Sequence, residues 1–573
     1  MKTNSQFSNH HVNGYASSDS AATNLAGVDA PLILGDSDLT LEQVVAVARN
    51  NRWVQITENQ VVLDRIDKSH EFIMRAVASG KIIYGVTTAF GGMAHVLLSA
   101  AEAEEIQNSA IHLFKSGAGK PLPVQDVRAG MLLRMRSHLH GASGVRLELV
   151  RRLALFLNAN MAPIVPGLGA IGASGDIVPL SYICGAVIGS SDEFAVEHNG
   201  ERIGAITALK RLGLEPMRLL PKEGLAMFNG TSVMTGIAMN RAYEAQLLFA
   251  LTLCSHALFV QAFRGTNESF HPFIQQMKPH SGQVAVADAM VRLLAGSELS
   301  VDESNERVPQ SRGELVQDRY ALRCIPQYLG PIWDGLKQIS AQLVVEANSA
   351  TDNPLIDAAA GRAYHGGNFL GQYIGIGMDQ LRYYLGLLAK HLDVQIGWLV
   401  APEFNNGLPA CLVGNPENAV NLGLKGLQIV GNSIMPLITF YGNSLADRFP
   451  THAEQFNQNL NSQGFGSANL ARQSIELFQQ YMAICLIFAV QGVDWRTKQR
   501  YGHYDAMAAL SPETRRLYTA VRRVTGVPVR GDRPFIWNDN EQYLDEYVAR
   551  LAADISNDGE IAEAAMNALA IFS

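Results

Sequence analysis

The sequence predicts a mainly α-helical protein in which a bundle of long helices occupies the second half of the chain. From Leu370 to Leu392, apolar residues recur at spacings of three and four, which places them on one face of a helix. The same spacing recurs in four other segments, at residues 233–263, 330–349, 418–438 and 468–492. With 47% hydrophobic and only 17% charged residues, the 573-residue chain can bury the large core that such a bundle needs.

The first part of the chain is more broken and is predicted to form a separate domain. Residues 1–29 are rich in Ser, Asn and Ala and lack the apolar segment of a secretory signal, so we expect a flexible tail. Shorter helical patterns and Gly-rich turns then alternate, with helices expected at 98–115 and 145–158 and turns at 85–92, 117–119 and 167–175. Because functional residues gather in such loops, we expect residues 30–225 to carry the active-site loops and residues 226–573 to form the bundle and C-terminal helices.

Composition excludes several classes of partner. The formal net charge of −8 gives no general attraction to nucleic acid or to an anionic membrane. Apolar runs such as residues 482–490 are short of the roughly 20 residues that a membrane-spanning helix needs. Five scattered cysteines form no CxxC pair and suit reduced thiols in the cytoplasm. We therefore expect a cytoplasmic protein.

The most informative motif is Ala173-Ser174-Gly175, inside the last Gly-rich turn. Such a triplet can cyclise when the Gly175 nitrogen attacks the Ala173 carbonyl carbon. Loss of two waters, one involving the Ser174 hydroxyl, leaves 4-methylidene-imidazol-5-one, abbreviated MIO. A bare glycine permits the close backbone approach, and only serine readily yields the exocyclic methylene. The product is an electrophile, which no ordinary side chain supplies.

A second copy of the triplet, Ala142-Ser143-Gly144, stands in a different sequence context. An amphipathic segment begins directly after it, so Ser143 is predicted to be a helix N-cap. The copy at Ser174 instead precedes Asp176 and Pro179, which favour a non-helical turn. The sequence therefore favours Ser174 as the modified residue.

The segment Gly169–Ile183, GAIGASGDIVPLSYI, resembles the GxxGASGDLxPLxxI signature of the aromatic amino-acid ammonia-lyases, relatives of histidine ammonia-lyase. Further family segments stand in order along the chain. They are YGVTTAFG from Tyr84, KEGLAMFNGT from Lys222, QDRYALR from Gln317, TDNPL from Thr351, HGGNF from His365 and THAEQFNQ from Thr451. The resemblance covers roughly residues 35–550 and is closest to bacterial, cyanobacterial-type phenylalanine ammonia-lyases. It implies the long-helix fold that ammonia-lyases share with fumarase and aspartase.

The resemblance also implies roles for individual residues. The ring formed from Ala173, Ser174 and Gly175 would take the substrate amino group and improve its departure. Tyr84 would be the base that removes the β-proton, which requires a lowered phenol pKa. Tyr320 would act beside it at the ring.

The substrate-binding residues implied by the resemblance fall into three groups. Arg323 would grip the carboxylate with its planar fork, and it lies three residues after Tyr320, on the same helical face. The polar residues near the ring, the aromatic end or the leaving amine would be Asn229, Gln317, Asn353, Lys425, Glu454 and Gln458. Apolar walls would come from Leu225 and Phe369.

Two departures from the family pattern bear on the substrate. Ala89 stands where the loop after Tyr84 usually has Gly, which could change loop flexibility. Before Lys115-Ser116-Gly117 the family has Phe-Leu for phenylalanine or His-Leu for tyrosine, whereas this chain has Leu113-Phe114, with His112 one position upstream. The resemblance implies that Leu113 and Phe114 bind the aromatic end of the substrate. A shift of one residue turns a helical side chain by about 100°, so we expect His112 to point away from the pocket.

The resemblance implies an ammonia-lyase that converts L-phenylalanine to trans-cinnamate as a homotetramer whose sites draw on several subunits. With the ring made from its own chain, it implies no metal and no soluble cofactor. A tyrosine or dihydroxyphenylalanine ammonia-lyase stays open, because an apolar pocket rejects one hydroxyl weakly. An MIO-dependent aromatic 2,3-aminomutase stays open as well, since it would use the same ring and base. A fumarase-type lyase is disfavoured because the chain lacks a GSSxMPxKxN loop, and a non-catalytic scaffold would not need these residues in family register.

Overall fold

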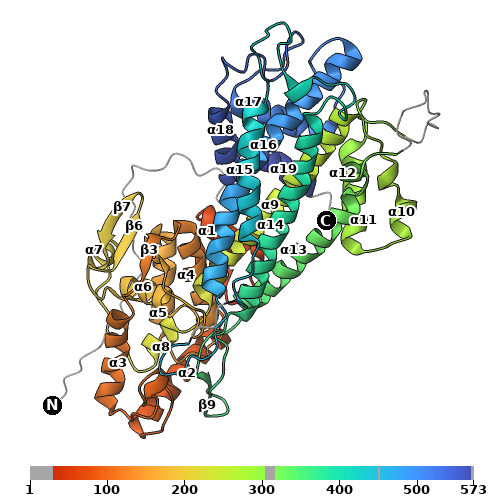
Figure 1. Ribbon diagram of the computed structural model, residues 1–573. Helices are drawn as coiled ribbons and strands as arrows, with labels where there is room; N and C mark the ends of the chain where they lie inside the picture. The colour runs from red at the N-terminus through yellow and green to blue at the C-terminus, as the bar shows by residue number, and fades with distance from the viewer. Residues whose placement is uncertain (1–29, 303–316, 449–451, 570–573) are drawn as a thin grey trace, which may run out of the picture.

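The structure, a computed structural model, describes residues 30–302, 317–448 and 452–569 (Figure 1). The tail expected at residues 1–29 lies outside the described residues. Within them the chain forms 19 α-helices and nine strands of three or four residues. The prediction of a mainly α-helical fold is therefore confirmed.

The long helices from residue 232 onward pack side by side into an elongated bundle (Figure 1). Its helices are α9 (Ser232–Phe263), α13 (Ile325–Ala347), α14 (Gln372–Leu399), α15 (Lys425–Tyr441) and α16 (Gly464–Tyr501). Helix α9 is apolar on all faces, and nearly all of its 32 residues are buried. A helix that is hydrophobic all round belongs in a core, so α9 and α16 form the centre of the bundle.

Two helices, α9 and α16, are long and apolar enough to cross a membrane by length and composition. The prediction that no apolar segment reaches that length was wrong for these two. In their most apolar windows, however, 94% and 83% of the residues are buried inside the protein. Packing against the other bundle helices therefore accounts for their apolar character.

Smaller helices pack on the sides and the upper end of the bundle (Figure 1). They are α10 (Pro272–Gln276), α11 (Ser281–Leu294), α12 (Tyr320–Arg323), α17 (Pro512–Thr525), α18 (Leu544–Ser556) and α19 (Glu560–Leu569). Helix α17 ends at Gly526, which adopts a positive φ of 75°, and α18 and α19 pack back onto it.

The N-terminal part combines short helices with small sheets. Its helices are α1 (Leu41–Arg49), α2 (Gln60–Ala78), α3 (Ala100–Leu113), α4 (Val124–His138), α5 (Leu147–Asn158), α6 (Ile177–Ile188), α7 (Ala205–Arg211) and α8 (Glu223–Phe228). Helix α4 packs lengthwise on α9 and so joins this part to the bundle. Strand β1 (Leu32–Leu34) pairs in parallel with β2 (Val54–Ile56).

The other sheets are antiparallel and equally small. Strand β3 (Ala118–Pro121) pairs with β5 (Pro166–Leu168), and β6 (Ala195–His198) lies between β4 (Met161–Pro163) and β7 (Glu201–Gly204). In the second half, β8 (Leu355–Asp357) pairs with β9 (Arg362–Tyr364). The sequence did not predict these strands, because three or four residues are too few to show a period of two.

The prediction that Ser143 caps a helix was wrong. Helix α5 begins at Leu147, its N-cap is Arg146, and no side chain caps it. Ser143 is instead buried in the preceding turn, where Gly144 adopts a positive φ of 71° and donates its N–H to the Ser69 hydroxyl at 3.1 Å. The triplet at Ser143 is therefore a packed turn under α2 and not a helix start.

Candidate active site

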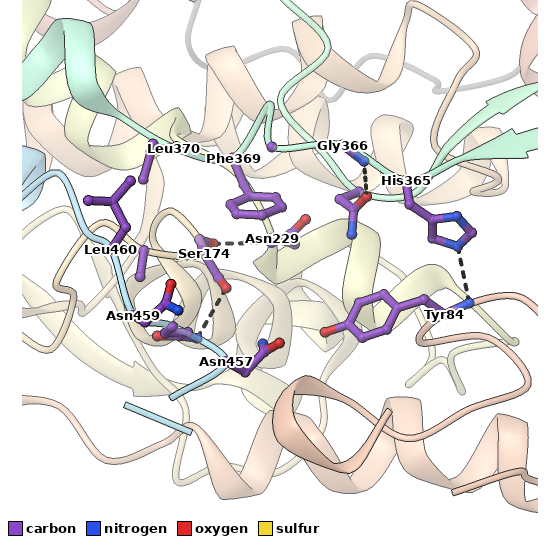
Figure 2. Close-up of a pocket in the computed structure, with 14 residues that line it drawn as sticks. Tyr84, Ser174, Asn229, His365, Gly366, Phe369, Leu370, Asn457, Asn459 and Leu460 are labelled. Carbon is purple, nitrogen blue, oxygen red and sulfur yellow. Dashed lines mark hydrogen bonds between the residues drawn. The ribbon is translucent and has the colours of Figure 1, made fainter. Parts of the chain in front are cut away.

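The triplet Ala173-Ser174-Gly175 lies in the loop between β5 and α6 and faces a cavity of about 570 Å³. This cavity gathers residues from loops that are far apart in the sequence (Figure 2). Seven of the residues predicted from the sequence line it, namely Tyr84, Ala173, Ser174, Asn229, Asn353, Phe369 and Gln458. The fold therefore brings these predicted residues together in one chain.

Two side-chain amides hold Ser174 from opposite sides (Figure 2). The Asn229 Nδ2 donates to the Ser174 carbonyl oxygen at 3.2 Å, and the Gln458 Nε2 donates to the Ser174 hydroxyl at 3.1 Å. Among the described residues, the buried Asn229 Oδ1 has no hydrogen-bond partner. An acceptor is therefore left available beside the triplet.

The turn at Gly175 is closed tightly by the loop that precedes α9. Gly175 adopts a φ of +71°, and a Cβ added there would lie 2.1 Å from the Gly230 carbonyl oxygen. Only glycine fits this close approach without strain. The residues present therefore suit a ring made from this backbone, because the turn is compact and its third residue carries no side chain.

Asp176 fixes the triplet to the bundle. Its Oδ2 accepts hydrogen bonds of 2.8 Å from the N–H groups of Val233 and Met234, in the first turn of α9. Its own N–H donates to the Gly230 carbonyl oxygen at 2.7 Å. Burial raises the pKa of Asp176 to about 7, although both N–H groups and nearby Arg134 oppose the shift.

Tyr84 lies in the turn after α2 and directs its hydroxyl into the cavity (Figure 2). The hydroxyl oxygen accepts a hydrogen bond of 2.9 Å from the Gly91 N–H. Burial raises the pKa of Tyr84, the Gly91 N–H lowers it, and the carboxylate of Glu454 raises it further. The expectation of a lowered pKa was therefore wrong for the isolated chain, because burial and a neighbouring negative charge outweigh one hydrogen bond.

Glu454 and Asn353 each contact a loop that carries cavity residues. Glu454 packs against Gly91, since a Cβ added at Gly91 would meet the carboxylate at 2.1 Å. The Asn353 Oδ1 accepts from the Gly366 N–H at 2.8 Å and so holds the loop that carries Phe369. Figure 2 shows the Phe369 ring facing Asn229 and Ser174.

Several residues that line the cavity were not predicted from the sequence. His365, Asn457 and Leu460 contribute to the lining, and the His365 Nε2 accepts from the Tyr84 N–H at 3.4 Å. All three stand in or next to family segments, so their proximity to Phe369 and Gln458 was the available signal.

The segment around Lys115 divides into residues that face inward and residues that face outward. The Phe114 ring packs edge-on against Phe228, with the ring centres 5.3 Å apart, and Leu225 is buried on the same helix α8. Leu113, in contrast, is 70% exposed, and Leu113, Phe114 and Leu225 are all outside the residues that line the cavity. Within this chain Leu113 therefore provides no wall, because it ends α3 on the solvent side.

His112 points away from the cavity, as the one-residue shift predicts. Its Nε2 lies 2.9 Å from the Ser190 hydroxyl, and its ring packs on Phe194.

Four predicted residues lie apart from Ser174 in this chain. Gln317 is exposed just before α12, and Tyr320 and Arg323 are the first and last residues of α12. The Arg323 guanidinium lies 4.5 Å from the centre of the Tyr320 ring, so the two do share a face. Helix α12, however, lies at the opposite end of the molecule from α2 and α8, and Lys425 is exposed at the start of α15 (Figure 1).

The fold and this loop-lined cavity define a helical-bundle protein of the ammonia-lyase type. The family model described as "Aromatic amino acid lyase" matches residues 39–523, so the chain belongs to this family. A phenylalanine ammonia-lyase from Nostoc punctiforme is 58% identical over 94% of both chains. An aromatic ammonia-lyase from Loktanella atrilutea is 46% identical over 94% of this chain and 98% of its own.

Solved structures show the same architecture. The phenylalanine aminomutase of Pantoea agglomerans superposes with a TM-score of 0.82 at 29% identity, over 93% of this chain and 99% of its own. The prediction of the ammonia-lyase fold is thus confirmed.

Proposed function

We propose that this protein eliminates ammonia from L-phenylalanine and releases trans-cinnamate. The observation that carries the proposal is the Ala173-Ser174-Gly175 turn, held by the Asn229 and Gln458 amides opposite Tyr84. Support comes from the family and from the 58% identical phenylalanine ammonia-lyase. In the reaction the Cα–N bond breaks, one β-proton leaves, and the electron pair of the C–H bond becomes the new double bond.

The prosthetic group fits this turn and would supply an electrophile for the substrate amine. The chain's own residues then have separate tasks. Tyr84, as phenolate, accepts the β-proton, and its hydroxyl already faces Ser174 across the cavity. Asn229 and Gln458 orient the turn, and Phe369 offers a ring surface to the substrate side chain.

One requirement is not met within a single chain. A carboxylate that enters a partly buried site needs a cation, and none of the described residues that line the cavity is Arg or Lys. Arg323, which the resemblance assigns to this task, lies on α12 at the far end of the bundle (Figure 1). We therefore propose that a second copy places Tyr320 and Arg323 over the Ser174 cavity.

The surface of the bundle supports this assembly. Large apolar side chains are exposed along α13, α14 and α15, which is unusual for a monomer. They are Val345, Tyr373, Ile376, Tyr383, Val394, Ile429, Val430, Leu437 and Phe440. These exposed apolar faces suit the proposed homotetramer, whose closed symmetry would bury the same faces in every subunit. The cation of a second copy would also lower the pKa of Tyr84, which burial raises in the single chain.

Absorbance of trans-cinnamate tests the proposed reaction. The purified protein is incubated separately with L-phenylalanine, L-tyrosine and L-histidine, and the Ser174→Ala variant is run alongside. Cinnamate should form with wild type and not with the variant, while intact mass shows two waters lost only in wild type. Formation of β-phenylalanine with the same mass loss would indicate an aminomutase, and no mass loss in wild type would refute the lyase.

Subunit mixing tests the shared site. The Ser174→Ala and Arg323→Ala chains are each expected to be inactive, and their co-expression should restore activity. Random mixing leaves roughly a quarter of the sites with both intact residues when the two come from different chains. If both residues acted within one chain, no site would recover.

A further inference from the structure

Helix α12 is held by buried polar residues on α14 that were not predicted from the sequence. His391 and Gln395 are four residues apart and therefore lie on one face of α14. The His391 Nε2 and the Gln395 Nε2 both donate to the carbonyl oxygen of Ala321, each at 2.8 Å. Ala321 directly follows Tyr320 and lies two residues before Arg323, so these two hydrogen bonds hold the helix that carries both residues.

His256 of α9 orients the glutamine. It lies 2.7 Å, through Nδ1, from the Gln395 Oε1, which can only accept, so His256 is the donor. The amide of Gln395 is thereby fixed with its Nε2 toward Ala321. The rings of His256 and His391 lie 4.3 Å apart, and all three polar side chains are buried.

The charge state of the two histidines fits these roles. Burial lowers the pKa of His391 to about 4 and the pKa of His256 well below its ordinary value. Each neutral imidazole has one N–H, and each uses it in the bonds just described. Among the described residues, the other ring nitrogens, His391 Nδ1 and His256 Nε2, have no hydrogen-bond partner. The donors are therefore fully committed to holding α12.

Helix α12 depends on such outside support because it has only four residues, about one turn. A second support comes from Arg319, whose guanidinium lies 5.9 Å from the Trp398 ring centre and 5.0 Å from that of Phe404. Tyr320 itself is 72% exposed. Its ring contacts the Arg323 guanidinium of the same one-turn helix, so the placement of both side chains follows how the backbone of α12 is held.

We propose that His391 and Gln395 are positioning residues that, through the Ala321 carbonyl, aim Tyr320 and Arg323 at the active site of another copy. This inference rests on the proposed function, because it assigns α12 to substrate binding in trans. Two buried donors on one carbonyl restrain both the position and the rotation of a one-turn helix. A misplacement of about 1 Å at such a site can cost roughly 100-fold in rate.

The test compares two ligands that differ in the carboxylate. Trans-cinnamate carries the group that Arg323 would bind, whereas cinnamyl alcohol has the same aromatic system without the charge. The variants are His391→Leu and Gln395→Met, which remove a donor, and His391→Gln, which keeps one near the Nε2 position. Gln491→Met is the matched control, since Gln491 is a buried glutamine that donates to the carbonyls of Leu412 and Ile536 at 3.0 and 2.9 Å.

We expect His391→Leu and Gln395→Met to weaken cinnamate inhibition and to lower kcat/KM for L-phenylalanine by about 10- to 100-fold. Inhibition by cinnamyl alcohol, oligomer size and the loss of two waters should stay as in wild type. His391→Gln should recover most of the loss, and Gln491→Met should not separate the two inhibitors.

If His391→Leu and Gln395→Met weaken inhibition by both ligands equally, or by neither, the inference is overturned. The proposed function would still stand in that case, provided that wild type forms cinnamate. Failure of wild type to form cinnamate would overturn both.

Discussion

Replacing Lys222 by Met tests how the candidate site is held together from behind. The Lys222 Nζ donates to both carboxylate oxygens of Asp352, at 2.9 and 2.8 Å, and both side chains are 0% exposed. Lys222 precedes α8, which leads to Asn229, and Asp352 precedes Asn353. The ion pair therefore joins the two segments that carry the asparagines of the cavity.

The size of the effect depends on the groups that Met leaves behind. Met has nearly the shape of the lysine stem. It would adopt the same left-handed backbone conformation, with a φ of 79°, so packing and backbone strain should change little. The carboxylate of Asp352 stays buried and keeps one bond, from the Asn353 N–H at 2.7 Å. Removing one partner of a buried pair costs about 3–5 kcal/mol, and nearby Arg134 places the loss near the lower figure, about 3 kcal/mol.

Urea unfolding followed by circular dichroism at pH 8 measures this loss. Arg75→Met is the control, because the Arg75–Glu71 pair is 67% and 62% exposed and should contribute less than about 1 kcal/mol. The double variant Lys222→Met with Asp352→Asn should recover part of the loss, since no net charge is then buried. The reasoning is refuted if Lys222→Met matches Arg75→Met, or if the double variant is no more stable than Lys222→Met alone.

Three further predictions concern the triplet and its surroundings. Gly175→Ala should abolish both cinnamate formation and the loss of two waters seen by mass, because its Cβ would meet the Gly230 carbonyl oxygen at 2.1 Å; turnover by this variant would contradict the close packing. Asp176 has its pKa raised from 3.8 to about 7, so between these pH values the folded state keeps a proton that the unfolded state has lost. Urea titrations should therefore show wild type losing stability relative to Asp176→Asn as pH rises from about 4 to 7, and a constant difference would argue against the shift. His112→Ala should leave the ratio of phenylalanine to tyrosine turnover unchanged, because the ring contacts Ser190 outside the cavity, whereas a changed ratio would show that it reaches the substrate.

Long helices were the part of the fold that the sequence predicted best. The segment expected at 233–263 is α9, Ser232–Phe263, and the one expected at 145–158 is α5, Leu147–Asn158. Helix α15 was placed too early, since residues 418–424 form a loop and the helix begins at Lys425. The apolar spacing continues through that loop because Leu424 is buried there without being helical. The domain division at residue 225 stays a prediction.

The candidate site was predictable where residues are close in sequence and unpredictable where tertiary structure decides. The segment around Ser174 identified the triplet, and family segments identified Asn229, Asn353 and Gln458. Spacing also placed Tyr320 and Arg323 on one face, and their 4.5 Å contact confirms it. No local pattern could show that α12 lies at the far end of the bundle, because that depends on how α13 and α14 run.

The two halves of the proposed site differ in how they are held, and this difference bears on how the enzyme would work. Behind the triplet, the buried guanidinium of Arg134 donates to the carbonyls of Asn229 and Thr351, at 2.9 and 3.0 Å. Burial lowers the pKa of Arg134 to about 10, so it remains charged at neutral pH and these bonds stay charge-assisted.

This half is therefore rigid within one chain, and its geometry does not require a partner. In the half that carries Tyr320 and Arg323, the Tyr320 side chain is exposed, and α12 is held by the buried Leu322 and by the two bonds to the Ala321 carbonyl. Assembly would then add the carboxylate-binding cation to a turn that is already formed. Ring formation should accordingly survive the loss of Arg323, whereas turnover should not, since the first depends on the fold of one chain and the second on the contact between two.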